Sequence, residues 1–588
     1  MKNILFFLLL FVSCINKSID KPNILFVSID DLNDWNEPLS GNNKVFTPFL
    51  EEFSNESVNF TKNYCTSPGC NPSRATMMTG IHTFNSGMYS NYQDWRKVPI
   101  LNKATTLPQL FRENGYFTAG AGKIYHYSQV HPESWDDYFP SQTQNMPKNY
   151  IPEDAPVNMK PFEYMYSAFD WAELSINDEQ TGDFKSVNYI SSFFKKEHNK
   201  PFFLACGIYR PHLPWYVPKK YFDMYPLDSI ELPKLLENDT LDLGERAKEL
   251  ISRGGNYHKN IVDNGKWKDA IRGYMASVSY ADAMVGKLIE NLKKSKYAKN
   301  TIVIISSDHG WQLGEKMHWR KFALWENVIR TLLMVKVPKN ISILPMGSSN
   351  GNDVKSLTSL LDIYPTLTDL AGIEPKSKLD GTSLIPLLKN PNELTNREVI
   401  TTYDFADYSI RFKDWHYINY VDGSEELYNL EEDDEEWNNL AYNKNYFSLI
   451  QDFRNKIPKN PIPLESFCGN GSRCAVHYAA SNKISKKNIS MFLARNKYHE
   501  AYINKSKVSI KMNDISNIKK INNDFYIDLE SPHYVRICDD LNNIDFKKNI
   551  EKIKIDNNAK YGNFNINLVQ IISKNEINVR TFEKGVEG

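Results

Sequence analysis

The chain has no excess of either charge, few cysteines and almost no long apolar runs. Its 588 residues include 70 Lys and Arg against 71 Asp and Glu, a formal net charge of −1. Because there is no global positive field, nucleic acid is excluded as the main partner, although a local basic site for an anionic substrate is not. Seven cysteines are too few for a disulfide scaffold, and a pairing of Cys468 with Cys474 is left open. Beyond residue 12 no stretch is long and apolar enough for a transmembrane helix.

The N-terminal residues have the pattern of an export signal. Lys2 precedes an apolar run over 4–12, which is too short to span a bilayer and predicts a signal-peptide core. The run ends near Cys14 in a segment that resembles a bacterial lipoprotein processing site, followed by a polar tether at 15–21. An ordinary secretory signal with an incidental cysteine is the alternative. We expect an exported protein, in the periplasm or at the outer membrane or cell surface, whose only membrane contact is a lipid anchor on Cys14.

The segment 70–74 places a cysteine, a proline and an arginine at the start of a predicted helix. Pro72 suits a first helical turn, because its missing N–H would have no partner there. Cys70 is then expected at a helix N-terminus, which favours an anion. Arg74 follows at the interval that brings two side chains onto one helix face. The segment therefore combines a reactive side chain with a fixed cation, and a small buried cysteine before an ordinary helix is the alternative.

Two buried strands far apart in the sequence each end in metal-ligating residues. The apolar run 23–29 leads into Asp30 and Asp31, and the run 301–306 leads into Asp308 and His309. Ligands in open α/β sheets bind at the carboxyl ends of strands, so these side chains can meet at one edge. Three carboxylates suit Ca²⁺ or Mg²⁺ better than zinc, whereas a solvated surface turn is the alternative for each pair.

Two further strands lead into loops with basic side chains. A strand near 116–119 precedes a glycine-rich loop that carries Lys123 and His126. The strand 201–208 precedes a loop in which two prolines hold His212 in an extended segment. Taken alone, these loops are equally consistent with solvated side chains. Trp215, which follows His212, suits either stacking on a sugar or packing in the core.

The remaining chain supplies scaffold and one more candidate cation. The pattern predicts a long helix over 267–294 and a segment 311–321 that ends in Lys321, with His318 and Arg320 as neighbours or as solvated residues. A strand over 331–337 and a helix over 362–372 complete this part. Antiparallel strands are expected at 409–421 and 426–430, then a solvated acidic turn at 431–436, a helix over 446–457, and short strands at 525–527 and 534–537.

Seven of these elements, in this order, resemble the signature of the type I sulfatases, over about residues 22–460. In chain order the elements are the aspartate pair at 30–31, Cys-x-Pro-x-Arg at 70–74, Gly-Lys-x-x-His at 122–126, the His212 loop, Asp308-His309, Lys321 and the segment 379–384. Many members carry Asn where His309 stands, and a His there is similar to the iduronate-2-sulfatase branch. The resemblance implies the α/β alkaline-phosphatase-like fold, a large mixed and mostly parallel sheet between helices. It also implies a catalytic domain at 22–390 and a small antiparallel sheet with a helix at 391–464. The signal and tether occupy 1–21. Residues 465–588 lie outside the resemblance, and their short alternating apolar pieces predict an accessory, β-rich extension.

The resemblance also implies a mechanism. Cys70 is converted after translation to formylglycine (3-oxoalanine) by a formylglycine-generating or anaerobic sulfatase-maturing enzyme, and its hydrate attacks sulfur. A divalent ion, Ca²⁺ rather than Mg²⁺, is held by Asp30, Asp31, Cys70, Asp308 and His309. Arg74, Lys123 and Lys321 offset sulfate charge, His212 protonates the leaving oxygen, and His126 assists release of sulfate. The expected substrate is a sulfated carbohydrate, either a glycosaminoglycan fragment or an algal polysaccharide such as ulvan or carrageenan.

Three other functions stay open on the sequence. One is a phosphoester or phosphonate monoester hydrolase of the same superfamily. The second is a carbohydrate-binding lipoprotein without activity, and the third is a thiol hydrolase that pairs Cys70 with His126 or His212. The sugar, the sulfated position, exo or endo action, the oligomeric state and the role of 465–588 are not determined by the sequence.

Overall fold

The computed structural model describes residues 21–462 apart from a few gaps, together with strands and short segments between 489 and 582. The gaps are 40–44, 128, 145, 149–150, 152–157, 159–168, 254–255 and 460. The chain divides into two compact units: nearly all residues up to Ile462 form the first, and Pro463–Gly588 make up most of the second. Cys14, Cys468 and Cys474 lie outside the described residues, so the expectations about them stay predictions.

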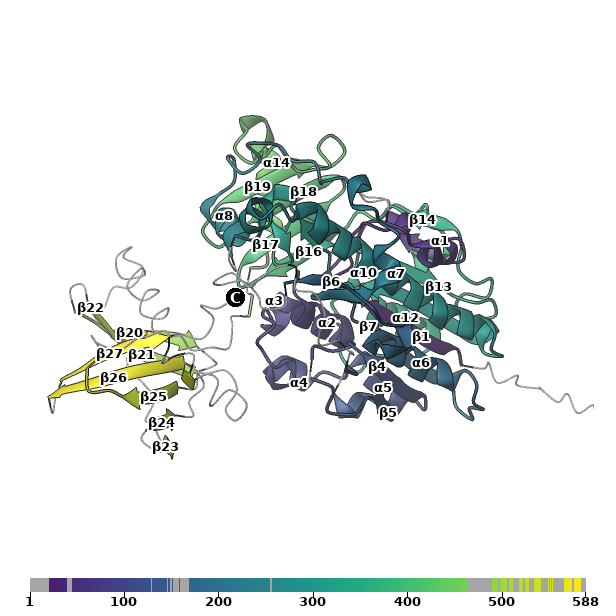
Figure 1. The fold of residues 1–588 in the computed structure, drawn as a ribbon, viewed down its shortest axis with the longest axis horizontal. Coiled ribbons are helices and arrows are strands. Elements are labelled where there is room, and N and C mark those ends of the chain that lie inside the picture. The colour runs from purple at the N-terminus through teal and green to yellow at the C-terminus, as the bar shows by residue number, and fades with distance from the viewer. Residues whose placement is uncertain are drawn as a thin grey trace, which may run out of the picture. The chain divides into compact units, whose positions relative to one another are not determined.

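A mixed sheet forms the centre of the first unit (Figure 1). Among the described residues its strands are ordered β14 (Asn352–Val354), β2 (Val58–Phe60), β13 (Leu333–Lys336), β9 (Thr301–Ser307), β1 (Asn23–Ile29), β7 (Phe202–Ile208), β4 (Phe117–Gly122) and β5 (Asp137–Phe139). The strands from β9 to β5 are parallel to one another, whereas β13 pairs antiparallel with both β9 and β2. The predicted large, mostly parallel sheet is confirmed.

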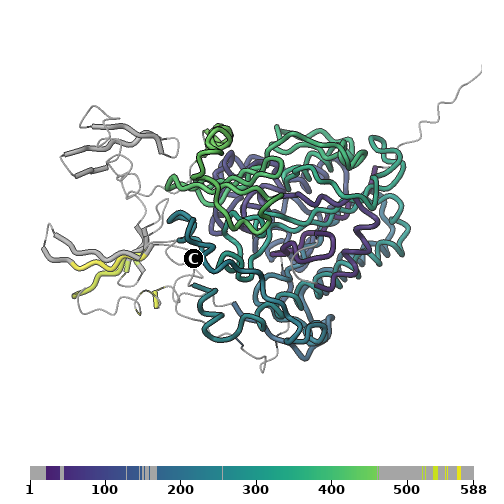
Figure 2. Tube along the Cα trace, turned by 90° about the horizontal axis from the view of Figure 1, so that it is seen from above, coloured from purple at the N-terminus to yellow at the C-terminus, as the bar shows by residue number. Residues whose placement is uncertain are grey.

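Helices cover both faces of this sheet because its central strands are apolar on both sides. One face carries α2 (Cys70–Thr79), α5 (Leu107–Glu113) and α12 (Ile363–Ala371), and the other carries α6 (Gly182–Phe193) and α10 (Trp267–Lys293). Ile24 and Phe26 of β1 belong to the core on the first face, so the side chains between them point to the second. Figure 2 shows early purple and later teal segments running side by side in this unit, as the pairing of β1 with β9 requires.

A second, antiparallel sheet lies in the C-terminal part of the first unit. It contains β16 (Glu398–Tyr403), β17 (Asp407–Phe412), β18 (Trp415–Asn419) and β19 (Glu425–Asn429). The helix α14 (Phe447–Lys456) packs on it through a small core that includes Ile410, Tyr417, Ile450 and Phe453. The expected small sheet with a helix is therefore present.

The acidic turn at 431–436 is not solvated throughout, so that prediction is wrong for Glu436. Its side chain is buried, contacts His416 and accepts a hydrogen bond from the backbone N–H of Glu326 at 2.9 Å. Burial raises the pKa of Glu436 to about 7. A run of like charges does not show which member turns inward, because that depends on partners elsewhere in the chain.

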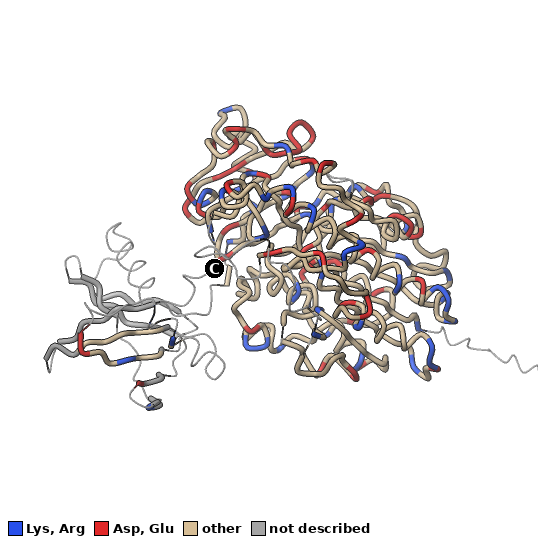
Figure 3. The backbone as a smooth tube through the Cα atoms, viewed as in Figure 1, with Lys and Arg blue, Asp and Glu red and all other residues tan. Residues whose placement is uncertain are grey.

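The other elements of the first unit are short. The helices are α1 (Pro48–Ser54), α3 (Thr83–Ser86), α4 (Pro99–Asn102), α7 (Lys219–Phe222), α8 (Glu245–Ser252), α9 (Tyr257–Asp263), α11 (Glu326–Ile329) and α13 (Ile385–Lys389). The strands are β3 (Asn63–Tyr64), β6 (Trp171–Leu174), β8 (Trp215–Pro218), β10 (Gln312–Leu313), β11 (Trp319–Arg320), β12 (Arg330–Thr331) and β15 (Thr358–Ser359). Figure 3 shows acidic and basic residues interspersed over this unit, in keeping with the balanced composition.

The second unit contains two sheets among its described residues. One has β20 (Ile489–Ala494), β21 (Lys497–Asn504) and β22 (Lys507–Ile510). The other has β23 (Ile518–Ile521), β24 (Asp524–Ile527), β25 (His533–Ile537), β26 (Asn565–Ser573) and β27 (Glu576–Phe582), which include the strands expected at 525–527 and 534–537. In the part of the chain that the structure describes, every helix is too short or too polar to cross a bilayer.

Candidate active site

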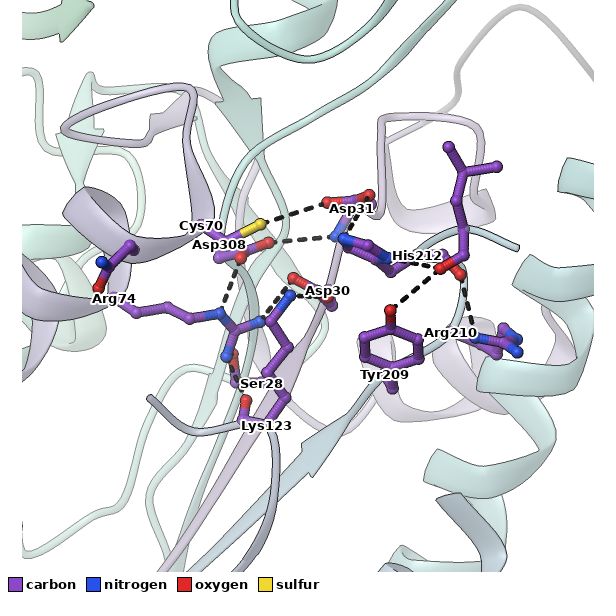
Figure 4. Close-up of polar contacts among 12 residues, drawn as sticks. Ser28, Asp30, Asp31, Cys70, Arg74, Lys123, Tyr209, Arg210, His212 and Asp308 are labelled. Atoms are coloured by element: carbon purple, nitrogen blue, oxygen red, sulfur yellow. Dashed lines mark hydrogen bonds and ion pairs between the residues drawn. The ribbon is translucent and has the colours of Figure 1, made fainter. Parts of the chain in front are cut away.

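The aspartates at the ends of β1 and β9 meet at one edge of the sheet. The two strands pair in register through Ile29 and Ser307, so Asp30 and Asp308 follow at the same level. The backbone N–H of Asp31 donates to Asp308 Oδ1 at 3.1 Å, which ties the two strand ends together. Figure 4 shows Asp30, Asp31 and Asp308 converging beside Cys70 and Arg74. Residues more than two hundred positions apart therefore form one acidic site.

Cys70 lies at the centre of this cluster. It is the first residue of α2, whose N-cap is Gly69 and which ends at Gly80 in the left-handed conformation. The thiol is completely buried, with Sγ 2.8 Å from Lys321 Nζ, 3.3 Å from His309 Nε2 and 3.8 Å from Asp31 Oδ1. Burial raises the pKa of the thiol to about 12. The unmodified side chain is thus a neutral thiol held against a cation and an imidazole.

Arg74 links the two strand ends from one turn further along α2. Its Nε donates to Asp308 Oδ2 at 2.8 Å and its Nη2 to Asp30 Oδ1 at 3.1 Å. All three side chains are completely buried. A guanidinium suits this place because its planar fork reaches two carboxylates at once.

Lys123 comes from the loop after β4 and pairs with Asp30 Oδ2. Two glycines allow this approach, since a side chain at Gly122 would meet the carbonyl oxygen of Gly207 in β7. The Lys123 ammonium lies 5.2 Å from the ring of Tyr127 and 5.3 Å from that of Tyr209. Burial raises the pKa of Asp30, but Lys123 and Arg74 outweigh this effect and leave the pKa well below its ordinary value.

Lys321 contacts both Cys70 and Asp31. Its Nζ donates to Asp31 Oδ1 at 2.8 Å and lies 5.6 Å from the ring of Trp311. Burial lowers the pKa of Lys321, but the charge of Asp31 outweighs this effect and raises the pKa above its ordinary value. Lys321 is therefore a fixed cation beside the thiol.

Two histidines border the cluster. His212 directs Nδ1 to the carbonyl of Leu213 at 2.7 Å, which leaves Nε2 facing Asp31 Oδ2 at 3.9 Å. His126 is buried in the loop that carries Lys123. Burial and the ammonium groups of Lys123 and Lys321 lower the pKa of both imidazoles. Direct contacts thus join all the predicted site residues except His126, which lies near enough to Lys123 and Lys321 for their charges to affect its pKa.

The donor atoms of this cluster fit a divalent cation. Ligand atoms of Asp30, Cys70, Asp308 and His309 lie within 4.8 Å of one another. Asp31 Oδ2 is buried without a hydrogen bond, and burial raises the pKa of that carboxyl. Both features are expected of a carboxylate whose free oxygen would bind a cation. His309 directs Nδ1 to the carbonyl of Gly310 at 2.9 Å, so its Nε2 lone pair faces the carboxylates.

Several neighbours differ from their expected roles or were missed. Trp215 packs in the core, with its indole N–H donating to the carbonyl of Pro211 at 2.7 Å, and is no platform for a sugar. His318 is buried and bonded to Gln312 Oε1 at 2.8 Å, so solvation is wrong for it. Arg320 is partly exposed and donates to the hydroxyl of Tyr257 at 2.7 Å.

Tyr274 of α10 is a supporting residue that sequence reasoning missed. Its hydroxyl donates to the carbonyl of Asp31 and accepts from the N–H of Asn33, both at 2.9 Å. These bonds hold Asp31 in the left-handed conformation, with φ 59°. No local signal marks this tyrosine, because its partner is in a different part of the chain.

The family description Sulfatase matches residues 22–373, which is more than half of the chain. The chain belongs to the sulfatase family. A second description, the C-terminal part of N-sulphoglucosamine sulphohydrolase, matches residues 314–461 of this sulfatase.

Named relatives agree with this assignment. A sulfatase from Formosa agariphila is 33% identical over 457 residues, which cover 76% of this chain and 88% of the relative. Iduronate 2-sulfatase of Mus musculus is 28% identical over 394 residues, covering 61% of this chain and 70% of the relative. The family and its relatives make this sulfatase a sulfuric ester hydrolase, and the family generally uses formylglycine and a divalent metal.

Solved structures confirm the expected fold. A protein in complex with its substrate D-glucosamine-2-N,6-O-disulfate superposes with a TM-score of 0.59 at 20% identity, covering 74% of this chain and 97% of the other. The phosphonate monoester hydrolase of Agrobacterium radiobacter has a TM-score of 0.61 at 20% identity, covering 74% of this chain and 94% of the other. At these identities the likeness shows the alkaline-phosphatase-like fold alone.

Proposed function

We propose that this sulfatase removes sulfate from a sulfated carbohydrate and that Cys70 is the precursor of its formylglycine nucleophile. The observation that carries the proposal is the position of Cys70 Sγ, 2.8 Å from Lys321 Nζ and 3.3 Å from His309 Nε2. A side chain in this place touches a fixed cation on one side and a metal-ligating set on the other. That arrangement suits a nucleophile that attacks an anionic ester.

The charges of the cluster favour a bound sulfate ester. Three buried cations, Arg74, Lys123 and Lys321, balance the three carboxylates of Asp30, Asp31 and Asp308. A divalent cation added to this set gives a net positive site, which attracts the anionic ester from solution. In a site closed to water such charges act strongly on the oxygens of the sulfate.

The divalent cation would be held by Asp30, Asp31, Asp308, His309 and the modified residue 70. When bound, it supplies Lewis-acid activation of the nucleophile and of the sulfate oxygens. The oxygen-rich set favours Ca²⁺, with Mg²⁺ as the second choice because it demands a stricter octahedron. Formylglycine, when present, supplies a hydrated aldehyde with two hydroxyl groups, one for attack and one for release, which a thiol lacks.

The side chains of this protein then have separate tasks. Arg74, Lys123 and Lys321 offset the charge that develops on the sulfate oxygens. With Nδ1–H bonded to Leu213, His212 would act as the imidazolium when the anionic ester is bound: the proton on Nε2 passes to the leaving oxygen of the sugar, and the ring returns to its neutral form. His126, near Lys123, accepts a proton when sulfate is released.

The substrate class is inferred from the relatives. Iduronate 2-sulfatase is named for a sulfated sugar, and one fold neighbour was solved with a disulfated glucosamine. We propose a sulfated oligosaccharide or polysaccharide, either a glycosaminoglycan fragment or an algal polymer such as ulvan or carrageenan. Export, with or without a lipid anchor on Cys14, would place the enzyme where such polymers occur.

The test uses protein coexpressed with a formylglycine-generating or anaerobic sulfatase-maturing enzyme. The intact mass of the peptide that contains Cys70 reports the conversion, and defined sulfated oligosaccharides are screened for sulfate release. Cys70→Ala should abolish release, whereas Cys206→Ala, at another buried free cysteine in β7, should leave it within a few-fold. An unconverted residue 70 in an active enzyme would overturn the proposal and favour a thiol hydrolase.

A phosphonate monoester hydrolase is the second candidate, because such an enzyme shares the fold. Matched 4-nitrophenyl sulfate and phenylphosphonate esters separate the two functions in one assay. We expect the sulfate to have the higher kcat/KM, and the opposite order would favour the phosphonate.

A further inference from the structure

The loop that carries His212 is held by a buried carboxylate that the proposed function leaves unused. Asp183, in the first turn of α6, is only 6% exposed. Its Oδ1 accepts the backbone N–H of Tyr209 at 2.8 Å and its Oδ2 accepts that of Arg210 at 3.1 Å. One carboxylate thus binds two successive N–H groups, and only Pro211 separates them from His212.

The side chains of Tyr209 and Arg210 hold the other end of the same loop. The Arg210 guanidinium donates to the carbonyl of His212 at 3.1 Å, and the Tyr209 hydroxyl donates to that of Leu213 at 3.0 Å. The Tyr209 ring lies 4.7 Å from the imidazole of His212. Figure 4 shows Tyr209 and Arg210 beside His212, with their contacts to the loop as dashed lines.

These contacts fix which nitrogen of His212 faces the reaction. The carbonyl of Leu213 accepts a hydrogen bond from Nδ1–H of His212, and the same carbonyl accepts one from the hydroxyl of Tyr209. Nε2 then faces the acidic cluster, 3.9 Å from Asp31 Oδ2. A shift of the Tyr209–Arg210 peptide would turn the imidazole, because the chain between them and His212 is a single proline.

We propose that Asp183 is a positioning residue, which aims Nε2 of His212 at the leaving oxygen of the substrate through the backbone of Tyr209 and Arg210. This inference rests on the proposed function of His212. It predicts that loss of Asp183 harms substrates that need a proton on the leaving oxygen more than those that do not. A sugar alcohol is a poor leaving group and needs the proton, whereas 4-nitrophenolate leaves without it.

Asp183→Asn is the informative variant. An amide offers a single acceptor oxygen, so one of the two N–H groups would face an NH₂ donor, and the loop must move. A displacement of about 1 Å at the imidazole costs roughly a hundredfold in rate. Asp282→Asn is the matched control, since Asp282 of α10 is equally buried and accepts the successive N–H groups of Phe49 and Leu50, at 3.2 and 2.8 Å, away from the loop.

The experiment measures kcat/KM of the matured enzymes on a sugar sulfate and on 4-nitrophenyl sulfate. His212→Ala, Asp183→Asn, Asp282→Asn and the double variant of His212 and Asp183 are compared, with melting temperatures recorded for each. We expect Asp183→Asn to lower the rate on the sugar sulfate by roughly a hundredfold, with less than a tenfold loss on the aryl sulfate. In the His212→Ala background the second change should have little effect.

The outcomes separate the two claims. Equal losses on both substrates, or the same selectivity in Asp282→Asn, would overturn the positioning role of Asp183. If His212→Ala lowers kcat/KM equally for the sugar sulfate and the aryl sulfate, the proposed role of His212 is wrong, whatever Asp183 does. For an Asp183→Asn protein that does not fold, Asp183→Ala is assayed with added formate, which has the size and charge of the carboxylate that this substitution removes. Rescue on the sugar sulfate alone supports the inference, and no rescue overturns it.

Discussion

Arg74→Lys tests whether the site depends on geometry rather than on charge alone. The substitution keeps the positive charge but replaces a planar fork by a single ammonium. In the structure the guanidinium donates to Asp308 Oδ2 at 2.8 Å, Asp30 Oδ1 at 3.1 Å, Ser28 Oγ at 3.2 Å and the carbonyl of Ile124 at 3.3 Å. A lysine has three donors at one point, so it cannot reach both carboxylates and the main-chain carbonyls together.

The expected loss follows from these contacts. At least two of these four hydrogen bonds of the charged side chain would be lost, each contributing about 1.5–3 kcal/mol, or about 3–6 kcal/mol in all. The lower figure corresponds to roughly a hundredfold in rate if it falls on the transition state. We therefore expect kcat/KM for sulfate release to fall at least a hundredfold, with weaker metal binding, although the net charge of the site is unchanged.

The assay compares kcat/KM and metal affinity of the variant with those of the parent. Arg397→Lys is the control, because Arg397 also forms a two-pronged pair, with Asp362 at 2.9 and 3.2 Å, outside the active site. That variant should lose stability but keep its kinetic constants within a few-fold. Activity of Arg74→Lys within threefold of the parent would refute the reasoning, because charge alone would then suffice.

Three further changes test separate parts of the structure. Chelation should abolish sulfate release and lower the melting temperature, because the buried carboxylates then repel one another, and added calcium should restore both better than magnesium; activity that persists in chelator would contradict the metal. Burial lowers the pKa of His82 from 6.5 to about 4. The unfolded chain therefore binds a proton at His82 before the folded protein does, and the folded protein loses about 2 kcal/mol of unfolding free energy by pH 5. His82→Gln should therefore lose less unfolding free energy than the parent between pH 7 and pH 5, and parallel curves would contradict this. Lys316→Met leaves the buried carboxylate of Asp239, 2.7 Å away, without its cation, and should lower the free energy of unfolding by about 3–5 kcal/mol in a denaturant titration; an unchanged value would show that Asp239 is protonated.

Much of the fold could be predicted because local patterns determine it. Buried parallel strands are apolar on both faces, so the continuous apolar runs at 23–29 and 301–306 identify them as strands. The long helix at 267–294 is identified by apolar residues at helical spacing. Each strand also marks its carboxyl end, where Asp30 and Asp308 stand. Two strands that pair in parallel must bring those ends together, and this geometric necessity made the cluster predictable.

The supporting contacts could not be predicted, because their partners are remote and their residue types are ordinary. Tyr274 is one of several apolar or aromatic residues along α10, and nothing in its neighbourhood indicates that it clamps Asp31. Asp183 looks like a helix-start carboxylate, a common feature with its own local explanation. The alternatives left open for Trp215 and His318 could not be decided from the sequence, since both side chains are buried by neighbours that only the fold supplies.

The complete burial of the Cys70 thiol has a consequence for the order of events in the cell. A second enzyme that oxidises this side chain needs it in its own pocket, yet the finished fold encloses it between a lysine, a histidine and an aspartate. If Cys70 is converted to formylglycine as proposed, the conversion would therefore precede folding, while the segment is still an extended peptide. On the same proposal, protein that folds first would keep the thiol, and a maturing enzyme added afterwards would recover activity only if the chain were unfolded again.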